Sequence, residues 1–159
     1  MIAVDTNLLV YAHRPESAWH EAVKRCLDDL VDTETEWAIP WPCLHEFLGI
    51  VTRSRVFKVP TSLDQAIAQV DFWLEAPTLT LLGERPGYWL ELRELIADAK
   101  VTGAMIHDAR IAAICIQHDA ELWSADRDFG RFPGLRVRNP LVGDRLAERK
   151  ARYARRQRA

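Results

Sequence analysis

Short apolar segments alternate along this chain with longer segments in which apolar residues recur at helical spacing. The expected strands cover residues 2–4, 37–39, 78–82, 121–124 and 135–138. The expected helices begin near Ser17, span 43–51, follow Thr61, begin at Pro86 and span about 104–118. Because strands that alternate with helices usually pair in parallel with helices on both faces, the pattern predicts a three-layer α/β/α fold around a mostly parallel sheet of about five strands.

Residues that favour helix starts support these boundaries. Ser17 is predicted to cap the first of the helices, and Thr61 with Asp64 has the spacing of a weak capping box. Pro42 and Pro86 both suit a first helical turn, where no backbone N–H is needed. The helix after Thr61 carries apolar residues at helical spacing, namely Leu63, Ile67, Val70 and Leu74.

Length and composition limit the classes of protein that this chain can belong to. Its 159 residues suit one domain, and 48% hydrophobic with 28% charged residues is typical of soluble globular proteins. Apolar runs end well before the ~20 residues of a membrane span. Asp5 also interrupts any signal-peptide core. Three cysteines (Cys26, Cys43 and Cys115) without a CxxC spacing indicate reduced thiols, so we expect a cytoplasmic protein.

The net charge of −2 is unevenly distributed. Residues 144–159 contain seven basic and two acidic residues, which leaves fourteen basic and twenty-one acidic residues in 1–143. We expect a domain over residues 1–142 and a basic C-terminal extension, helical or flexible, over 143–159. The extension is either an ordinary solvated terminus, a contact for RNA phosphates or a docking segment for a protein partner.

Two acidic residues follow predicted strands. Asp5 comes after Ile2-Ala3-Val4, and Asp126 after the strand at 121–124, with Asp128 two residues further on. Ligands bind outside the carboxyl ends of the strands in parallel sheets, so Asp5 and Asp126 are expected at one edge. Asn7 is expected to hold Asp5 in one rotamer. As alternatives, Asp5 caps the next helix, and Asp126 and Asp128 are ordinary turn residues.

Two further acidic residues lie in apolar helical sequence. Glu46 has Cys43 and Ile50 as its helical neighbours, which weakens its interpretation as an ordinary solvated side chain. Asp108 is followed by Ala112 on its face, and such small side chains let the helix approach the sheet and carry the carboxylate inward. A partly buried acid is costly unless it is paired or bound to a cation.

Carboxylates that meet in one place repel one another unless a cation neutralises them. Oxygen ligands favour Mg²⁺ or Mn²⁺, and an acidic metal site of this kind serves phosphoryl chemistry. The sequence contains neither a glycine-rich phosphate loop nor a G-x-S-x-G motif, which argues against nucleoside triphosphate hydrolysis and a serine hydrolase.

Histidine and tryptophan residues are given structural interpretations. His45 and His107 each precede one of the carboxylates, so they are expected to point elsewhere on their helices. No H-x-x-x-H pair is present, which disfavours zinc catalysis. Trp41 and Trp89 are attributed to packing or an interface rather than to base stacking.

The order of these motifs resembles the PIN domain, and it is most similar to the VapC toxins of type II (VapBC) toxin–antitoxin pairs. The resemblance is carried by Asp5-Thr6-Asn7, Glu46, the segment His107-Asp108-Ala109-Arg110-Ile111-Ala112-Ala113 and the segment Ser124-Ala125-Asp126-Arg127-Asp128-Phe129. It covers residues 1 to about 142. The motifs are specific as an ordered set, although each is weak alone.

This resemblance implies a Mg²⁺- or Mn²⁺-dependent endoribonuclease that cuts tRNA or rRNA, is silenced by a cognate VapB-type antitoxin and forms a homodimer. It implies that Asp5 and Asp108 bind the main ion. Glu46 would complete the coordination or position water, and Asp126 would support a second ion. The implied supporting residues are Asn7, which orients Asp5, Ser124, where the family often has Thr, and Asp128, an acid found in part of the family.

Three other functions remain as alternatives. An aspartyl-nucleophile phosphatase would need a second acid two residues after Asp5, where Asn7 stands. A catalytically silent PIN module would bind RNA or a partner only, and the presence of all four acids argues against it. A stand-alone PIN nuclease that processes RNA would lack an antitoxin gene.

Overall fold

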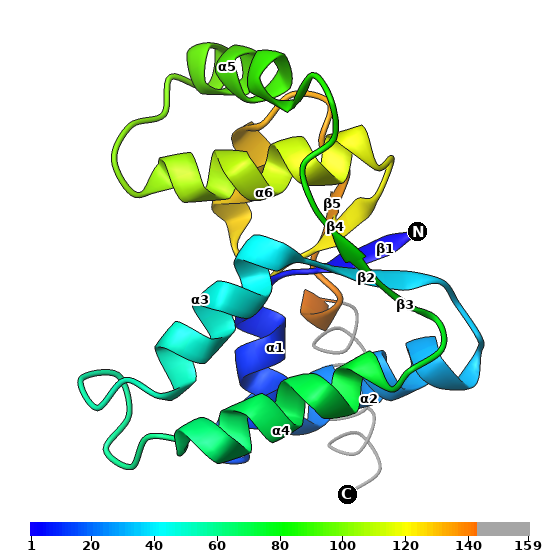
Figure 1. Cartoon of the computed structure of the whole chain (residues 1–159), viewed down its shortest axis with the longest axis vertical. Helices are drawn as coiled ribbons and strands as arrows, with labels where there is room; N and C mark the ends of the chain where they lie inside the picture. Colours follow the sequence, from blue (N-terminus) through cyan, green and yellow to red (C-terminus); the bar gives the residue numbers. More distant parts are fainter. Residues whose placement is uncertain (143–159) are drawn as a thin grey trace, which may run out of the picture.

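The computed structural model describes residues 1–142, which form a sheet with helices on both sides (Figure 1). The elements are β1 (Ile2–Val4), α1 (Thr6–His13), α2 (His20–Asp32), β2 (Trp37–Pro40), α3 (Trp41–Val51), α4 (Leu63–Leu74), β3 (Leu79–Leu82), α5 (Tyr88–Ala99), α6 (Met105–Gln117), β4 (Glu121–Trp123), the 3₁₀ helix η1 (Arg127–Arg131) and β5 (Val137–Arg138). The predicted basic extension, 143–159, lies outside the described residues. Within residues 1–142, no helix is both long and apolar enough to cross a bilayer.

Five parallel strands form the sheet in the order β3-β2-β1-β4-β5. The central strand β1 places Ile2 opposite Trp37 of β2 on one side and opposite Glu121 of β4 on the other. The chain moves outward from β1 to β3 and then resumes on the other side of β1 with β4. A crevice opens at such a change of direction, outside the carboxyl ends of the two strands. The predicted α/β class and parallel five-strand sheet are confirmed.

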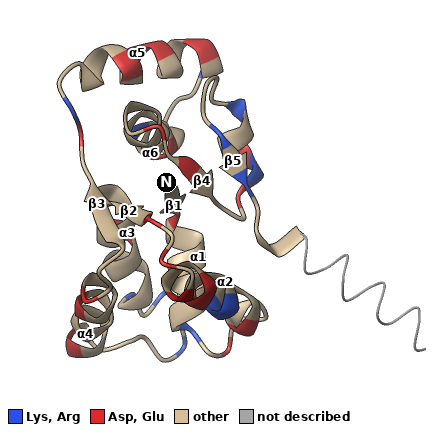
Figure 2. Ribbon diagram, turned by 90° about the vertical axis from the view of Figure 1, so that its right-hand side faces the viewer, with Lys and Arg blue, Asp and Glu red and all other residues tan. Residues whose placement is uncertain are grey.

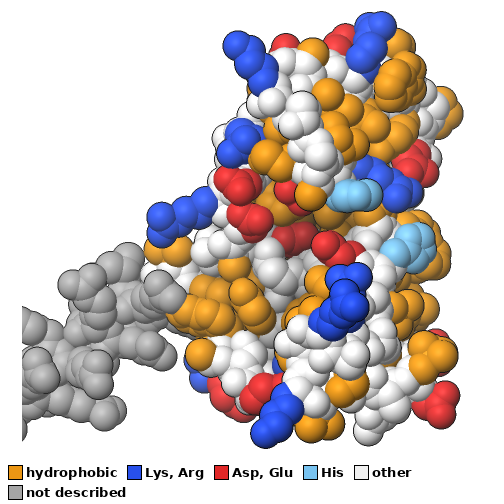
Figure 3. All heavy atoms as spheres, turned by 90° about the vertical axis from the view of Figure 1, so that its left-hand side faces the viewer, with side chains coloured by type: hydrophobic (Ala, Val, Ile, Leu, Met, Phe, Trp, Pro, Cys, Tyr) orange, Lys and Arg blue, Asp and Glu red, His pale blue; other side chains and the backbone are white. Residues whose placement is uncertain are grey.

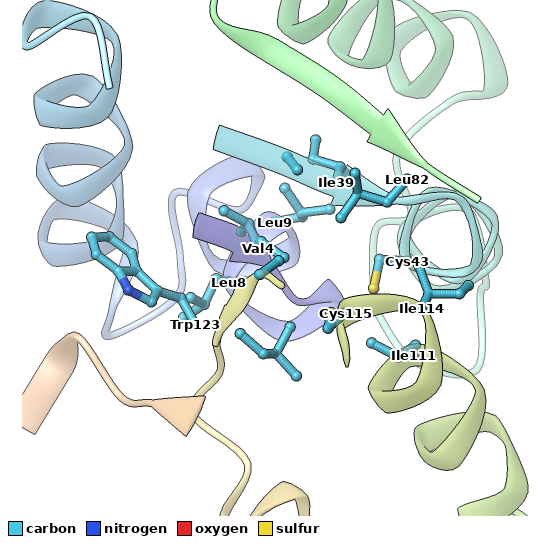
Figure 4. Close-up of a cluster of buried hydrophobic side chains, with 14 of the residues drawn as sticks. Val4, Leu8, Leu9, Ile39, Cys43, Leu82, Ile111, Ile114, Cys115 and Trp123 are labelled. Carbon is cyan, nitrogen blue, oxygen red and sulfur yellow. The ribbon is translucent and has the colours of Figure 1, made fainter. Parts of the chain in front are cut away.

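Helices α5 and α6 lie on one side of the sheet, and α1, α2 and α4 lie on the other (Figure 1). Helix α6 packs against β2 and β4, whereas α3 contacts both α1 and α6. The buried side chains between these elements come from every layer (Figure 4), and they include Val4, Leu8, Leu9, Ile39, Cys43, Leu82, Ile111, Ile114, Cys115 and Trp123. This core joins the helices to the carboxyl ends of β1 and β4.

Small residues allow α6 to approach the sheet closely. Ala109, Ala112 and Ala113 are all fully buried, as the sequence pattern predicts. Asp108, in the first turn of α6, is therefore carried to the edge of the sheet and is half-buried. The expectation that small neighbours draw this carboxylate inward is confirmed.

Two predicted helix caps are wrong. Helix α2 begins at His20 rather than near Ser17, although the Ser17 hydroxyl still accepts a hydrogen bond of 3.2 Å from the Trp19 backbone N–H. The capping box of α4 is formed by Ser62 and Gln65, not by Thr61 and Asp64. Thr61 is instead buried, and its hydroxyl contacts the side chains of His13 in α1 and of Arg14, which follows α1.

The apolar residues of α4 also differ from a simple core stripe. Leu63, Ile67 and Leu74 are exposed, while the neighbouring Ala66 and Trp73 are buried. Helix α4 packs against α3 through the face that carries Trp73, whose ring lies edge-on to that of Phe47 with ring centroids 4.9 Å apart. The spacing of apolar residues predicted this helix, but it did not show which face packs inward, because both faces carry apolar residues.

The two sides of the molecule at the strand ends differ in charge. Figure 2, which faces the amino ends of the strands, shows basic residues around β5 and acidic residues along α5. Figure 3, which faces the carboxyl ends, shows acidic side chains gathered in a central hollow of the surface. The predicted functional edge of the sheet is therefore also the edge where carboxylates are concentrated.

Candidate active site

Asp5, Asn7 and Ser124 form one hydrogen-bond network at the ends of β1 and β4. The Ser124 hydroxyl donates to Asp5 Oδ2 over 2.7 Å, and Asn7 Nδ2 donates both to Asp5 Oδ2 and to Ser124 Oγ, the latter over 2.9 Å. The other amide atom, Asn7 Oδ1, accepts from the Ala125 backbone N–H at 3.1 Å. Asn7 thus connects the segments that follow two adjacent strands, and it fixes the rotamer of Asp5 as the sequence predicts.

Asp5 does stand at the N-cap position of α1, but its side chain makes no capping hydrogen bond. Only its main-chain carbonyl serves the helix, by accepting from the backbone N–H groups of Leu8 and Leu9 at 3.1 and 3.3 Å. The carboxylate turns toward Ser124 instead, and the Cys43 thiol lies 3.8 Å from Asp5 Oδ1. The capping alternative therefore holds for the backbone of Asp5 and not for its carboxylate.

Burial makes ionisation of Asp5 costly. Its side chain is only 4% exposed, and this burial raises its pKa to about 7. The Ser124 hydroxyl opposes the shift, whereas the charges of Glu46 and Asp108 add to it. The pKa of Asp108 is also raised, first by burial and then by the charges of Asp126, Glu46 and Asp128. These carboxylates come from four separate segments and are close enough to influence one another, and we call them the acidic cluster: Asp5, Glu46, Asp108, Asp126 and Asp128.

Glu46 is exposed, contrary to the apolar surroundings that its neighbours in α3 indicated. One contact nevertheless orients it, because the Thr6 hydroxyl donates to Glu46 Oε2 over 2.6 Å. Thr6 is 4% exposed and holds the carboxylate toward the strand ends. The sequence analysis missed this role, although a buried hydroxyl between Asp5 and Asn7 was a signal that could have revealed it.

Asp126 and Asp128 lie on the exposed rim of the cluster. Asp126 caps η1, since its Oδ1 accepts from the Asp128 backbone N–H at 2.8 Å, while its own N–H donates to Ser124 Oγ. Asp128 forms an ion pair with Arg131 at 3.0 Å. The turn role that we kept as an alternative thus applies to both residues, and Asp126 in addition acts electrostatically on Asp108.

The donor set suits a hard divalent cation. It consists of carboxylate and hydroxyl oxygens, and neighbouring carboxylates raise the pKa of Asp5 and that of Asp108, a repulsion that a bound cation would offset. Among the residues that the structure describes, no three Asp, Glu, His or Cys side chains are placed as a group that could hold an ion. Neighbouring hydroxyl, backbone N–H and guanidinium groups instead donate hydrogen bonds to the carboxylates of Asp5, Glu46, Asp126 and Asp128.

His45 does not point away from the neighbouring Glu46 as expected, whereas His107 lies in a lining that does not include Asp108. Both line a hollow of about 360 Å³ together with Glu46 and Arg110. Trp41 is 45% exposed, and its ring lies 5.8 Å from that of His45, so packing in the core does not explain it. Helical spacing did not predict this, because two consecutive residues of a helix can line neighbouring parts of one hollow when a second helix forms its other side.

Comparisons with known proteins identify the family of this chain. The PIN domain family model matches residues 2–135. Ribonuclease VapC43 of Mycobacterium tuberculosis is 40% identical over 145 residues, which are 90% of this chain and 97% of the relative.

Solved structures show the same fold at lower identity. The chain resembles VapBC2 from Rickettsia felis, bound to a DNA fragment from its promoter, at 23% identity and a TM-score of 0.67, with coverage of 87% of this chain and 98% of that one. It also resembles VapC20 of Mycobacterium tuberculosis, described as a toxin that cleaves the sarcin-ricin loop, at 16% identity and a TM-score of 0.62, covering 86% and 99%. This chain belongs to the PIN domain family and, within it, to the VapC ribonucleases.

Proposed function

We propose that this VapC-family ribonuclease hydrolyses RNA phosphodiester bonds at the acidic cluster, with Mg²⁺ or Mn²⁺ as its cofactor. The observation that carries the proposal is the buried Asp5, whose pKa is raised to about 7 beside Glu46 and Asp108. A carboxylate kept in such a place at a cost in stability indicates a functional site. A bound divalent ion supplies an activated water and stabilises the charge that develops on the phosphate.

The roles of the protein groups follow from their contacts. Asp5 and Asp108 are the proposed ligands of the main ion, because both are withdrawn from water. Glu46, oriented by Thr6, is proposed to complete the coordination or to position water. Asp126 is proposed to support a second ion.

Two supporting residues act through Asp5. Asn7 and Ser124 hold its carboxylate in one orientation, and the Ser124 hydroxyl favours the ionised form. Asp128 is engaged with Arg131, so we assign it an indirect effect on Asp108 through its charge.

We also propose that the chain is the toxin of a VapBC pair, bound and silenced by a VapB-type antitoxin. Relatives named as VapC ribonucleases and the VapBC complexes among the structures of similar fold support this. A tRNA or an rRNA is the proposed substrate, and VapC20, which cleaves the sarcin-ricin loop, is a precedent for structured RNA. A substrate of this kind implies action in the cytoplasm.

A homodimer is proposed as well. Helix α4 exposes a set of large apolar side chains on one face that a second copy would remove from water, namely Leu63, Ile67 and Leu74. Light scattering after size exclusion should give about twice the mass of one chain. Ile67→Glu should return the protein to the monomer, whereas an unchanged mass would rule out this face.

The activity is tested with purified protein and total RNA in Mn²⁺. Wild-type protein should cut RNA, and Asp108→Asn should not, while Asp98→Asn on the exposed face of α5 should keep full activity. In cells, induction should arrest growth, and coexpression of a small adjacent antitoxin gene should restore it. Cleavage by Asp108→Asn at the wild-type rate would refute the proposed site.

A further inference from the structure

A hollow of about 360 Å³ opens between α3 and α6, directly beside the acidic cluster. Its lining residues are Pro42, His45, Glu46, His107, Arg110 and Ile111, and we call it the α3–α6 pocket. We propose that this pocket binds one base of the RNA, together with the phosphate beside it, next to the bond that is cut. This inference rests on the function proposed above and adds how the substrate is held.

The pocket has the size and the mixed chemistry of a ligand site. Its volume falls in the range of pockets that hold small organic molecules. Pro42 and Ile111 supply apolar wall, while the imidazoles of His45 and His107 offer hydrogen-bonding groups, and both histidines are exposed. A nucleotide has a flat aromatic base, polar base edges and an anionic phosphate, and the wall of the pocket offers a partner for each.

Aromatic rings beside the pocket provide a surface for stacking. The ring centroids of Trp41 and His45 are 5.8 Å apart, and their planes are tilted by 32° to one another. Trp41 is 45% exposed and lies beside Gly83, where an added Cβ would stand 3.6 Å from its Cδ1. Protein aromatic rings of this kind stack on unpaired bases with little regard to their identity.

Arg110 supplies positive charge where the substrate needs it. Residues 1–143 carry fourteen basic and twenty-one acidic residues, so a phosphate that approaches the acidic cluster is repelled unless cations stand nearby. Arg110 lines the pocket, and its Nε and Nη2 donate to Glu84 Oε1 over 3.1 and 2.8 Å. Glu84 and Tyr88 engage only part of the guanidinium, whose planar fork is held in place and suits a phosphate.

The pocket and the proposed metal site share a wall. Glu46 lines the pocket and also acts electrostatically on Asp5 and Asp108. His107 is the residue before Asp108 on α6. Figure 3 shows histidine and basic side chains beside the acidic hollow. A base in the pocket would therefore lie beside the phosphate that reaches the acidic cluster, and its contacts would select where the RNA is cut.

The binding test uses the Asp108→Asn protein, so that no RNA is consumed, and a single-stranded RNA oligonucleotide of random sequence followed by fluorescence anisotropy. Adding Trp41→Ala should weaken binding about tenfold, which is the loss expected for one stacked base. Trp89→Ala, which removes an indole that is 63% exposed on α5, is the matched control and should bind like the parent. Equal affinities of the Trp41 and Trp89 variants would overturn the inference.

A second readout concerns which sequence is cut. Cleavage of a random RNA pool in Mn²⁺ followed by sequencing of the new ends should show a base preference beside the cut, which His45→Ala should relax and Trp89→Ala should not. Arg110→Lys, which keeps the charge but not the fork, should weaken RNA binding less than Arg110→Gln. If wild-type protein cuts no RNA, the proposed function fails, but the binding test still shows whether the α3–α6 pocket binds RNA. If the pocket variants instead lose only binding of a coexpressed antitoxin, the pocket belongs to the protein partner.

Discussion

The hydroxyl of Ser124 donates a hydrogen bond of 2.7 Å to Asp5 Oδ2 across 119 positions of sequence. This contact joins the ends of β1 and β4, the two strands between which the direction of the chain changes. The same oxygen of Ser124 accepts from Asn7 and from the Asp126 backbone N–H, so one hydroxyl organises the two segments that follow β1 and β4.

Ser124 is therefore expected to act as a positioning residue. Its hydroxyl lowers the pKa of Asp5 against the effect of burial, so Ser124→Ala should raise that pKa further. Cleavage should fall about tenfold, and its rise with pH should move to higher pH. Ser124→Thr should restore both. A pH–rate profile of Ser124→Ala that coincides with that of wild type would contradict this role.

The stability of the metal-free protein should depend on pH in a defined direction. The pKa of Asp5 is about 7 in the folded state and 3.8 without perturbation, so between these values the folded state holds a proton that the unfolded state has lost. Stability should thus be greatest at low pH in this window and fall as pH rises from about 4 to 7, by on the order of 4 kcal/mol at most. Asp108 acts in the same direction.

Urea unfolding of metal-free protein across this range measures the effect. Asp5→Asn should flatten the decline and should be more stable than wild type at pH 7, whereas Asp98→Asn should follow the wild-type curve. A wild-type stability that rises between pH 5 and pH 7, with no difference in Asp5→Asn, would show that the Asp5 pKa is not raised.

The contact between Thr6 and Glu46 should matter for catalysis more than for folding. Thr6→Val keeps the shape of the buried side chain but removes the donor to Glu46, and we expect about tenfold slower cleavage. Thr6→Ser should cut like wild type. In a double-mutant cycle with Glu46→Gln, the two losses should not add, because both remove one interaction. Additive losses would assign Thr6 a separate role.

The basic extension is expected to contribute phosphate contacts. Residues 144–159 hold seven basic and two acidic residues, so deletion of 143–159 should weaken RNA binding at low salt and reduce the slope of log K against log salt. Anisotropy titrations between low and moderate salt measure this slope. An identical slope for the shortened protein would mean that the extension does not contact RNA.

Much of the site could be predicted because it follows from strand order. Asp5 and Asp126 were predicted at one edge because each follows a strand, and parallel pairing of β1 with β4 brings the ends of these strands together. Asp108 could be predicted from its alanine neighbours on α6, which are fully buried.

Other features depend on packing between helices, which local spacing does not determine. The bond between Thr6 and Glu46 needs α1 and α3 to meet at one angle, and the α3–α6 pocket needs the starts of two helices to lie side by side. The outward orientation of Leu63 on α4 likewise reflects which of two apolar faces packs better. For the same reason His45 was wrongly expected to point elsewhere.

The central claim is that the acidic cluster holds a divalent cation, and Mn²⁺ titration calorimetry tests it most directly. Wild-type protein should bind Mn²⁺ and release a proton on binding near pH 6, since the pKa of Asp5 is about 7 in the free protein. Asp5→Asn and Asp108→Asn should each lose this binding, while Asp98→Asn keeps it. Absence of Mn²⁺ uptake by wild-type protein, or equal uptake by all four proteins, would contradict the claim.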